Sequence, residues 1–249
     1  MHRSNIEIHN LDCLPFMKQC EDKQFDLAIV DPPYGIERAG QTETFTKNPK
    51  HKRKHHENKG WDNAIPTDEY FRELERISKN QIVWGANYFV AHLNKGTMGW
   101  IVWDKGQHGL SMSDCELAYS SFNKATRVFT FNRGLIAQKG GSIHPTQKPV
   151  ELYRYLLNEY AEKGNKIFDS HLGSGSIAIA CDDLGFDLTA CEIDKQYFDK
   201  ANKRLEPYRK QRTLFLLCLT NKYKTRFFYG FYTLLPIVIF VRWQINLKN

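Results

Sequence analysis

Residues 166–192 read KIFDSHLGSGSIAIACDDLGFDLTACE. Lys166–Phe168 predicts a strand, and a glycine-rich turn separates it from a predicted helix at Ser176–Leu184. Leu188–Cys191 predicts the next strand, with Glu192 at its end. Glycines allow close backbone approach to a ligand, a helix N-terminus offers free N–H groups, and an acid after the second strand can bind ribose hydroxyls. The stretch favours an adenosine-type cofactor, although a packing turn or a dinucleotide fingerprint would share the glycines.

The rest of the chain alternates strands and helices around this unit. Strands are expected at 6–9, 25–30, 81–84, 100–103, 116–120 and 127–131, the last two paired antiparallel. Helices are expected at 13–20, 66–79, 87–93, 149–160 and 197–205. Such alternation predicts an α/β sheet covered on both faces, with ligands beyond the carboxyl ends of its strands.

A second motif, Asp31-Pro32-Pro33-Tyr34-Gly35, directly follows the apolar strand 25–30. The two prolines remove two backbone N–H donors, so the loop presents carbonyl oxygens and one carboxylate, all acceptors. These acceptors suit a primary amine, and Tyr34 offers a flat face to a planar base. The alternative is a turn that ends the strand and exposes a tyrosine.

Two further segments stand out. His144-Pro145-Thr146-Gln147-Lys148-Pro149 opens a predicted helix, and Pro149 suits its first turn, which leaves the preceding residues unexplained. Residues 47–59 hold six Lys/Arg and three His against one acid. They form either a solvated loop or one that binds phosphates. The phosphate-binding candidates are Lys50, Lys52, Arg53 and Lys54. We expect no metal at the three histidines, because neither Cys nor Asp accompanies them.

Composition adds weaker constraints. The net charge of +7 suggests nucleic acid, but residues 203–249 hold ten Lys/Arg and one acid, so the remainder is slightly acidic. Six cysteines without CxxC spacing indicate reduced thiols of a cytoplasmic protein. The N-terminus carries no secretory signal pattern.

Together the motifs resemble the DNA amino-methyltransferases, and specifically their permuted β class. DPPYG is similar to the catalytic motif of that family, DSHLGSGS to its cofactor-binding glycine motif, and HPTQKP to the motif before the helix that covers the methionine end. A catalytic motif that precedes the glycine motif is the β-class order. The resemblance covers about residues 4–208 and implies a Rossmann-like, seven-stranded methyltransferase sheet with circularly permuted motifs and a reversed hairpin at its edge.

The resemblance also assigns roles to residues. Asp31, the carbonyl of Pro32, Pro33 and Tyr34 would form the catalytic motif that holds the target base. Residues implied at the S-adenosylmethionine site are Asp12, Cys13, Asp31, Lys148, Asp169, His171, Gly173, Gly175 and Glu192. Among these, Glu192 would bind the ribose, Asp12 would contact the adenine, and Lys148 would lie near the methionine end.

The implied reaction is methyl transfer from S-adenosylmethionine to the exocyclic amine of a base in double-stranded DNA, with adenine N6 favoured. Cytosine enzymes of the family more often have Ser in place of Asp31. Cytosine N4, RNA and a protein amide remain alternatives, as do a nucleotide-dependent oxidoreductase and a catalytically silent DNA-binding module. A cognate restriction endonuclease and a homodimer are left open as partners. The target-recognition segment is short here, since 132–143 alone separates the last predicted strand from HPTQKP.

The last part of the chain differs in composition. We expect a catalytic domain at 1–211, including a DNA-contacting loop at 40–63, and a separate apolar and basic tail at 212–249. Within the tail, Phe227–Val241 is nearly all apolar but shorter than the ~20 residues that span a bilayer. We therefore expect neither a membrane partner nor a catalytic role for the tail.

Overall fold

The computed structural model describes residues 4–37, 60, 62–93, 96–109, 113–132, 134–135 and 143–221, with side chains as far as residue 210. The predicted basic loop contacts Lys50, Lys52, Arg53 and Lys54 lie outside these residues, as does Phe227–Val241. By contacts the chain divides into two units, Met1–Arg209 and Lys210–Asn249.

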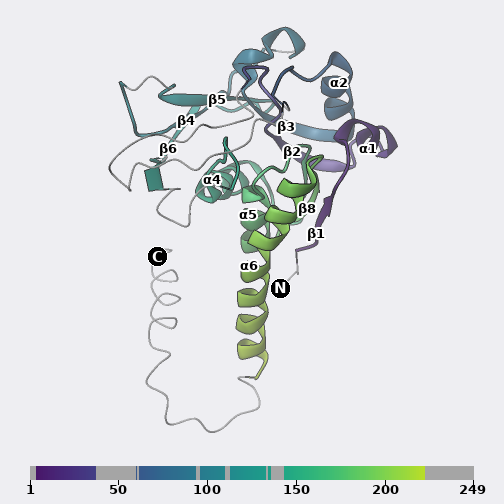
Figure 1. Ribbon diagram of the computed structural model, residues 1–249, viewed down its shortest axis with the longest axis vertical. Coiled ribbons are helices and arrows are strands. Elements are labelled where there is room, and N and C mark those ends of the chain that lie inside the picture. Colours follow the sequence, from purple (N-terminus) through teal and green to yellow (C-terminus); the bar gives the residue numbers. More distant parts are fainter. Residues whose placement is uncertain are drawn as a thin grey trace. The chain divides into compact units, whose positions relative to one another are not determined.

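A mixed sheet forms the centre of the first unit (Figure 1). Its strands are β1 (Ile6–His9), β2 (Phe25–Val30), β3 (Ser78–Trp84), β4 (Ile101–Asp104), β5 (Cys115–Ser120), β6 (Arg127–Thr130), β7 (Lys166–Asp169) and β8 (Asp187–Cys191). The order is β1-β8-β7-β2-β3-β5-β4-β6, so the described residues form eight strands rather than the expected seven. β5 runs antiparallel to both neighbours, and the other pairings are parallel.

The expected antiparallel pairing of the strands at 116–120 and 127–131 is wrong. β5 has β3 on one edge and β4 on the other, so neither edge is available to β6. β6 instead adds in parallel to the outer edge of β4, with Ile101 opposite Arg127. The reversed strand therefore lies inside the sheet, and β6 forms its edge.

The permuted order is visible in the pairing of the first strand. β1 lies beside β8, and Ile6 is in register with Leu188. Arg209, near the end of the first unit, donates a hydrogen bond to the carbonyl of Ile6. The N-terminal strand thus completes a sheet whose neighbouring strand comes from the far end of the unit.

Five helices accompany the sheet in the described residues. They are α1 (Cys13–Gln19), α2 (Asp68–Ile77), α4 (Val150–Tyr160), α5 (Ser176–Leu184) and α6 (Lys195–Asn221). The helix expected at 197–205 is therefore longer than predicted, and it continues past Pro207. The helix expected at 87–93 is wrong: two 3₁₀ turns, η2 (Ala86–Tyr88) and η3 (Val90–His92), occupy this segment. The buried Ala86 and Phe89 are three residues apart, a spacing that a 3₁₀ turn places on one side.

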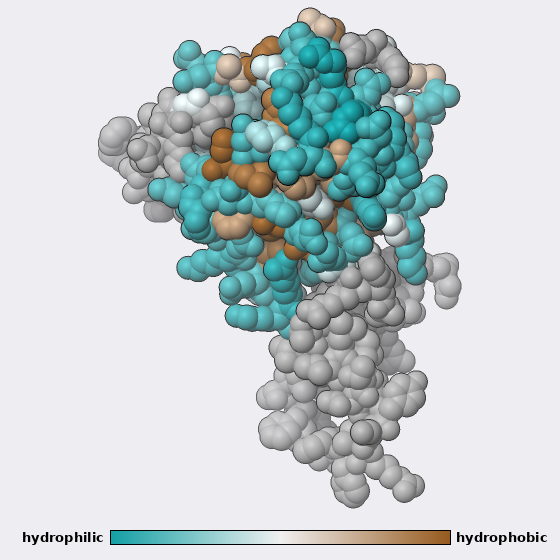
Figure 2. All heavy atoms as spheres, turned by 90° about the vertical axis from the view of Figure 1, so that its right-hand side faces the viewer, coloured by the Kyte–Doolittle hydropathy of each residue, from teal (hydrophilic) through white to brown (hydrophobic). Residues whose placement is uncertain are grey.

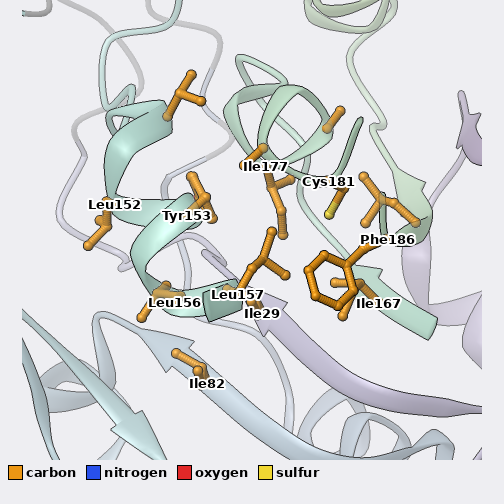
Figure 3. Close-up of a cluster of buried hydrophobic side chains, with 14 of the residues drawn as sticks. Ile29, Ile82, Leu152, Tyr153, Leu156, Leu157, Ile167, Ile177, Cys181 and Phe186 are labelled. Carbon is orange, nitrogen blue, oxygen red and sulfur yellow. The ribbon is translucent and has the colours of Figure 1, made fainter. Parts of the chain in front are cut away.

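Two cores pack on opposite faces of the sheet. Because side chains alternate along a strand, Leu27 and Ile29 of β2 join α4, α5 and α6 on one face. Ala28 and Val30 join α1 and α2 on the other face. Figure 3 shows part of the first core, where Ile29 lies among side chains of α4 and α5. The double covering buries the middle of the sheet and leaves its carboxyl edge for polar groups.

The face of the molecule in Figure 2 is mostly hydrophilic, with hydrophobic side chains in small areas between polar ones. Scattered exposed apolar side chains are normal on a protein surface. Within the described residues, no helix has the length and apolar character needed to cross a bilayer.

Candidate active site

The carboxyl ends of β2, β7 and β8 meet at one edge of the sheet, because these strands are parallel. Asp31 directly follows β2, Asp169 is the last residue of β7, and Glu192 directly follows β8. The structure therefore brings three acids from predicted strand ends to one edge of the sheet. They belong to two adjoining groups, one around the DPPYG loop and one around the glycine turn.

A buried carboxylate fixes the DPPYG loop. Asp62 accepts hydrogen bonds from the backbone N–H groups of Tyr34 (2.7 Å) and Gly35 (3.0 Å). The ring of Tyr34 lies against Gly85, where an added Cβ would stand 2.1 Å from a ring carbon. Tyr88 of η2 stacks on Tyr34 with ring centroids 5.2 Å apart, and it is 42% exposed. The loop thus presents a stacked aromatic pair beside Asp31.

Both carboxylate oxygens of Asp31 have partners. The Tyr34 hydroxyl donates to Oδ1 (2.6 Å), and the Lys148 ammonium lies 2.5 Å from Oδ2. Lys148 Nζ also donates to the Tyr34 hydroxyl oxygen (3.1 Å). Burial raises the pKa of the Tyr34 phenol well above its ordinary value, and Asp31 raises it further. Tyr34 therefore stays a hydrogen-bond donor at neutral pH.

Lys148 connects Asp31 to a second carboxylate. Its Nζ lies 3.2 Å from Glu116 Oε2, and Lys105 Nζ lies 3.0 Å from Glu116 Oε1. The Lys148 side chain is 2% exposed, and its ammonium lies over the ring of Trp84, 5.3 Å from the centroid. Two carboxylates and two ammonium groups alternate in this row, which extends from the end of β2 across β5 to the end of β4.

The glycine turn holds Glu192 in place. Gly173 donates its backbone N–H to Glu192 Oε2 (2.7 Å), and Asp194 donates to Oε1 (2.9 Å). Gly175, with φ +72°, caps α5 without a side-chain hydrogen bond, so the first N–H groups of this helix face the turn. Asn10 donates to the backbone carbonyls of Glu192 and Ile193, which joins the β1 end to the same corner.

A buried series of hydrogen bonds links the glycine turn to α2. Tyr70 and Ser170 share a hydrogen bond between their hydroxyls (2.6 Å), and Ser170 bonds His171 Nδ1 (2.7 Å). Burial lowers the pKa of His171 to about 4, so its ring is neutral at pH 7. Cys13 lies 4.0 Å from His171 Nε2, and burial raises the pKa of its thiol to about 12. Asp169 accepts the His171 backbone N–H, yet burial raises the pKa of its carboxyl to about 8.

Two predicted residues have other contacts in the structure. Asp12 is the N-cap of α1 and accepts the backbone N–H of Leu14, so its described side-chain contact is structural. Lys148, expected near the methionine end of the cofactor, contacts Asp31. The described residues contain no group of three or more side chains able to hold a metal ion.

Sequence reasoning missed Glu116, Lys105, Asp62 and Tyr88. Glu116 carried a usable signal, since a charged residue inside the apolar strand segment Cys115–Ser120 needs a buried partner. Asp62 and Tyr88 carried no such signal, because each lies in a turn whose course depends on the tertiary fold.

Comparisons with known proteins found one matching family model and several similar curated proteins. A family model described as DNA methylase (N6_N4_Mtase) matches residues 119–203. The chain is similar to the type II methyltransferase M.HpaI of Haemophilus parainfluenzae, with 25% identity over 232 residues, 76% of this chain and 71% of that protein.

Solved structures share the fold. The M1.HpyAVI–SAM complex superposes with a TM-score of 0.50 at 19% identity, covering 80% of this chain and all of that one. The cytosine-N4-specific PvuII DNA methyltransferase gives a TM-score of 0.55 at 9% identity, covering 81% and 86%. At such identities the likeness concerns the arrangement of the sheet and helices.

Proposed function

The chain belongs to the DNA methylases that modify adenine N6 or cytosine N4, and we propose that it transfers a methyl group from S-adenosylmethionine to adenine N6 in double-stranded DNA. The observation that carries the proposal is Asp31, an acceptor at the end of β2 next to the stacked rings of Tyr34 and Tyr88. The family more often has Ser at this position in cytosine enzymes, so Asp31 favours adenine.

The polar groups of the glycine turn fit an adenosine-type cofactor. Glu192 lies at a strand end beside the N-terminus of α5, and Ile193 next to it is 65% exposed. Each oxygen of a carboxylate can accept more than one hydrogen bond, so Glu192 can bind ribose hydroxyls while it holds Gly173. Asp169 and His171 would line the same site. When bound, S-adenosylmethionine supplies a methyl group on a positively charged sulfur.

The residues of the DPPYG loop would act on the base. The amine of adenine is a weak nucleophile because its lone pair is delocalised into the ring. Asp31 and the carbonyl of Pro32 would accept its two hydrogens, which favours a pyramidal nitrogen and frees the lone pair for attack. The amine must release a proton when it gains the methyl group. Asp31 can take this proton, because its carboxylate would already accept a hydrogen bond from the amine. Positioning both reactants can lower the barrier by roughly 7–11 kcal/mol.

The base must leave the duplex to reach Asp31, which costs a few kcal/mol. Stacking on the Tyr34 and Tyr88 rings would offset about 1–3 kcal/mol of this. Basic residues 50 and 52–54 remain the predicted contacts to the DNA backbone.

The test is methyl transfer from labelled S-adenosylmethionine to double-stranded DNA, followed by mass analysis of the nucleosides. We expect labelled N6-methyladenine from the wild-type protein. Asp31→Asn should lower transfer at least about 10²-fold, the order of loss for a misplaced reacting group, and should leave cofactor binding largely intact. Asp26→Asn, on the same strand but paired with Lys79 outside the site, is the matched control and should keep transfer. Labelled N4-methylcytosine would move the assignment to cytosine, and unlabelled DNA would refute the proposal.

A further inference from the structure

The row formed by Asp31, Lys148, Glu116 and Lys105 lies beside the proposed methyl-transfer site. Its two lysines are buried, its two carboxylates are partly exposed, and its formal charges sum to zero, because the carboxylates alternate with the ammonium groups. Removal of one lysine leaves an excess negative charge in the row, and removal of one carboxylate leaves an excess positive charge, which is unfavourable where water is partly excluded. Such a row needs a reason beyond stability, because buried ion pairs contribute little net stability.

The charges of the row are mutually dependent. Burial alone would lower the pKa of Lys148, but Asp31 and Glu116 raise it, so its ammonium persists. Burial would likewise raise the pKa of Glu116, yet Lys148 and Lys105 lower it to about 2. For Asp31, burial raises the pKa, Lys148 opposes the rise, and Glu116 adds to it. Lys148 is thus the cation that opposes protonation of Asp31.

We propose that Lys148 is a positioning residue that keeps Asp31 an oriented carboxylate for the amine of the target base, and that Glu116 and Lys105 hold Lys148 in place. The proposal rests on the proposed function, because it gives Asp31 its role as acceptor. A protonated Asp31 would present an O–H to the amine and could no longer accept on that oxygen. With Nζ at Oδ2 and the Tyr34 hydroxyl at Oδ1, the carboxylate is held at both ends.

The backbone of Lys148 is fixed as firmly as its ammonium. Ser176 of α5 donates its hydroxyl to the Lys148 carbonyl (2.7 Å), and Arg204 of α6 donates to the Ser176 hydroxyl oxygen (3.0 Å). The glycine-turn helix and the DPPYG loop are therefore coupled through one residue.

Other titratable groups also act on Asp31 and must enter any pH experiment. They are Tyr34 of its own loop, Tyr70 of α2, Glu116 of β5, Lys148 just before α4, Tyr153 of α4, and Asp169 of β7. The three tyrosines have raised pKa values and stay neutral at pH 7. Removal of Lys148 therefore tests the effect of an opposite charge on the Asp31 pKa, and removal of Glu116 tests the effect of a like charge.

The experiment compares Lys148→Met, Lys148→Arg, Glu116→Gln and the double variant Lys148→Met/Glu116→Gln in the full chain. Single-turnover methyl transfer to DNA is measured against pH at saturating cofactor. The titration of Asp31 is followed in the protein alone by carboxyl ¹³C NMR, with Asp31→Asn to assign the signal. Calorimetry gives the affinity for S-adenosylmethionine.

Loss of a close opposite charge moves a carboxyl pKa upward by about one to three pH units. We therefore expect Lys148→Met to move both the acid limb of transfer and the Asp31 titration upward by that amount, with partial recovery of transfer at high pH. Glu116→Gln should move both downward, and the double variant should lie between the single ones. Lys148→Arg keeps the charge and should stay near the wild-type profile.

An acid limb and an Asp31 titration that stay in place in Lys148→Met would overturn the proposal. Weakened cofactor binding with an unmoved limb would assign Lys148 to the cofactor instead. Should Lys148→Met not fold, Glu116→Gln decides alone, because a structural role predicts no downward shift. Wild-type protein that leaves DNA unmethylated would refute the proposed function, whereas the ¹³C titration would still test the ion row.

Discussion

Asp169 shows how burial can set the charge of a side chain. It ends β7 and is 2% exposed, and among the contacts of its carboxyl is the His171 backbone N–H. Burial raises its pKa to about 8, with further increases from Asp31 and Glu192, so the free protein keeps this carboxyl protonated at neutral pH. A ligand that brings positive charge to the glycine turn would favour its ionised form.

This protonation predicts a pH-dependent difference in stability between the wild-type protein and Asp169→Asn. The folded pKa lies above the unfolded value of about 3.9, so the folded state binds more protons. The contribution of Asp169 is complete below pH 4 and is lost as pH rises to about 8. The wild-type free energy of unfolding, relative to Asp169→Asn, should fall by roughly 1.4 kcal/mol per pH unit over this window. Urea unfolding of both proteins at several pH values measures it, and a constant difference would show that Asp169 titrates normally.

Single residues also mark the limit of what sequence could predict. Asp31 and Glu192 were found because each follows an apolar strand, a pattern that local sequence displays. The ion pairs of Lys148 were not found, because its partners Asp31 and Glu116 lie 117 and 32 positions earlier. Their proximity depends on strand order, which local patterns do not contain.

At the scale of elements, the turn after β3 positions the catalytic loop. Gly85 has φ +71° and its backbone lies against the Tyr34 ring, so η2 and the DPPYG loop are packed without space for a side chain. A methyl group at residue 85 must displace Tyr34, whose hydroxyl binds Asp31.

We therefore expect Gly85→Ala to lower the rate of methyl transfer by roughly 10²-fold, the scale for a reacting group misplaced by about 1 Å. Cofactor affinity should stay unchanged, because the glycine turn is not involved. The matched control is Gly164→Ala, which has φ +93° but nothing within 4 Å of the added Cβ. The control carries only the left-handed strain of about 1–2 kcal/mol and should keep its rate. Equal rates for both variants would mean that the position of Tyr34 is unimportant.

The elements themselves were predictable to different degrees. The strand–turn–helix–strand unit around α5 and the helix α4 follow strong periodic patterns, and the structure confirms them. The pairing of β5 and β6 was mistaken, because two short strands separated by a turn usually form a hairpin. Strand β4 overrode that local preference by occupying the free edge of β5.

At the scale of the whole molecule, the sheet is complete within the first unit. All eight described strands lie in Met1–Arg209, and Tyr197, Ala201 and Leu205 of α6 are buried there. The contact from Arg209 to Ile6 is the last described side-chain bond before the second unit.

A chain that ends at Gln211 should therefore fold and keep its methyl-transfer rate. Soluble yield, the thermal unfolding midpoint and transfer to DNA measure this. Full-length protein prepared in parallel is the control. A truncated chain that is insoluble or inactive would show that residues beyond 211 support the catalytic unit.

The pairing of β1 with β8 has a consequence for folding during synthesis on the ribosome. Asn5 donates its backbone N–H to Asp187, 182 residues later. At about 5–20 residues per second, the ribosome needs on the order of 10 to 40 seconds to synthesise that interval. During this time Ile6 and Ile8, which pack against the core in the finished protein, have no strand beside them. Strand β1 is thus made long before its partner, and the nascent chain must be kept from aggregating until β8 emerges.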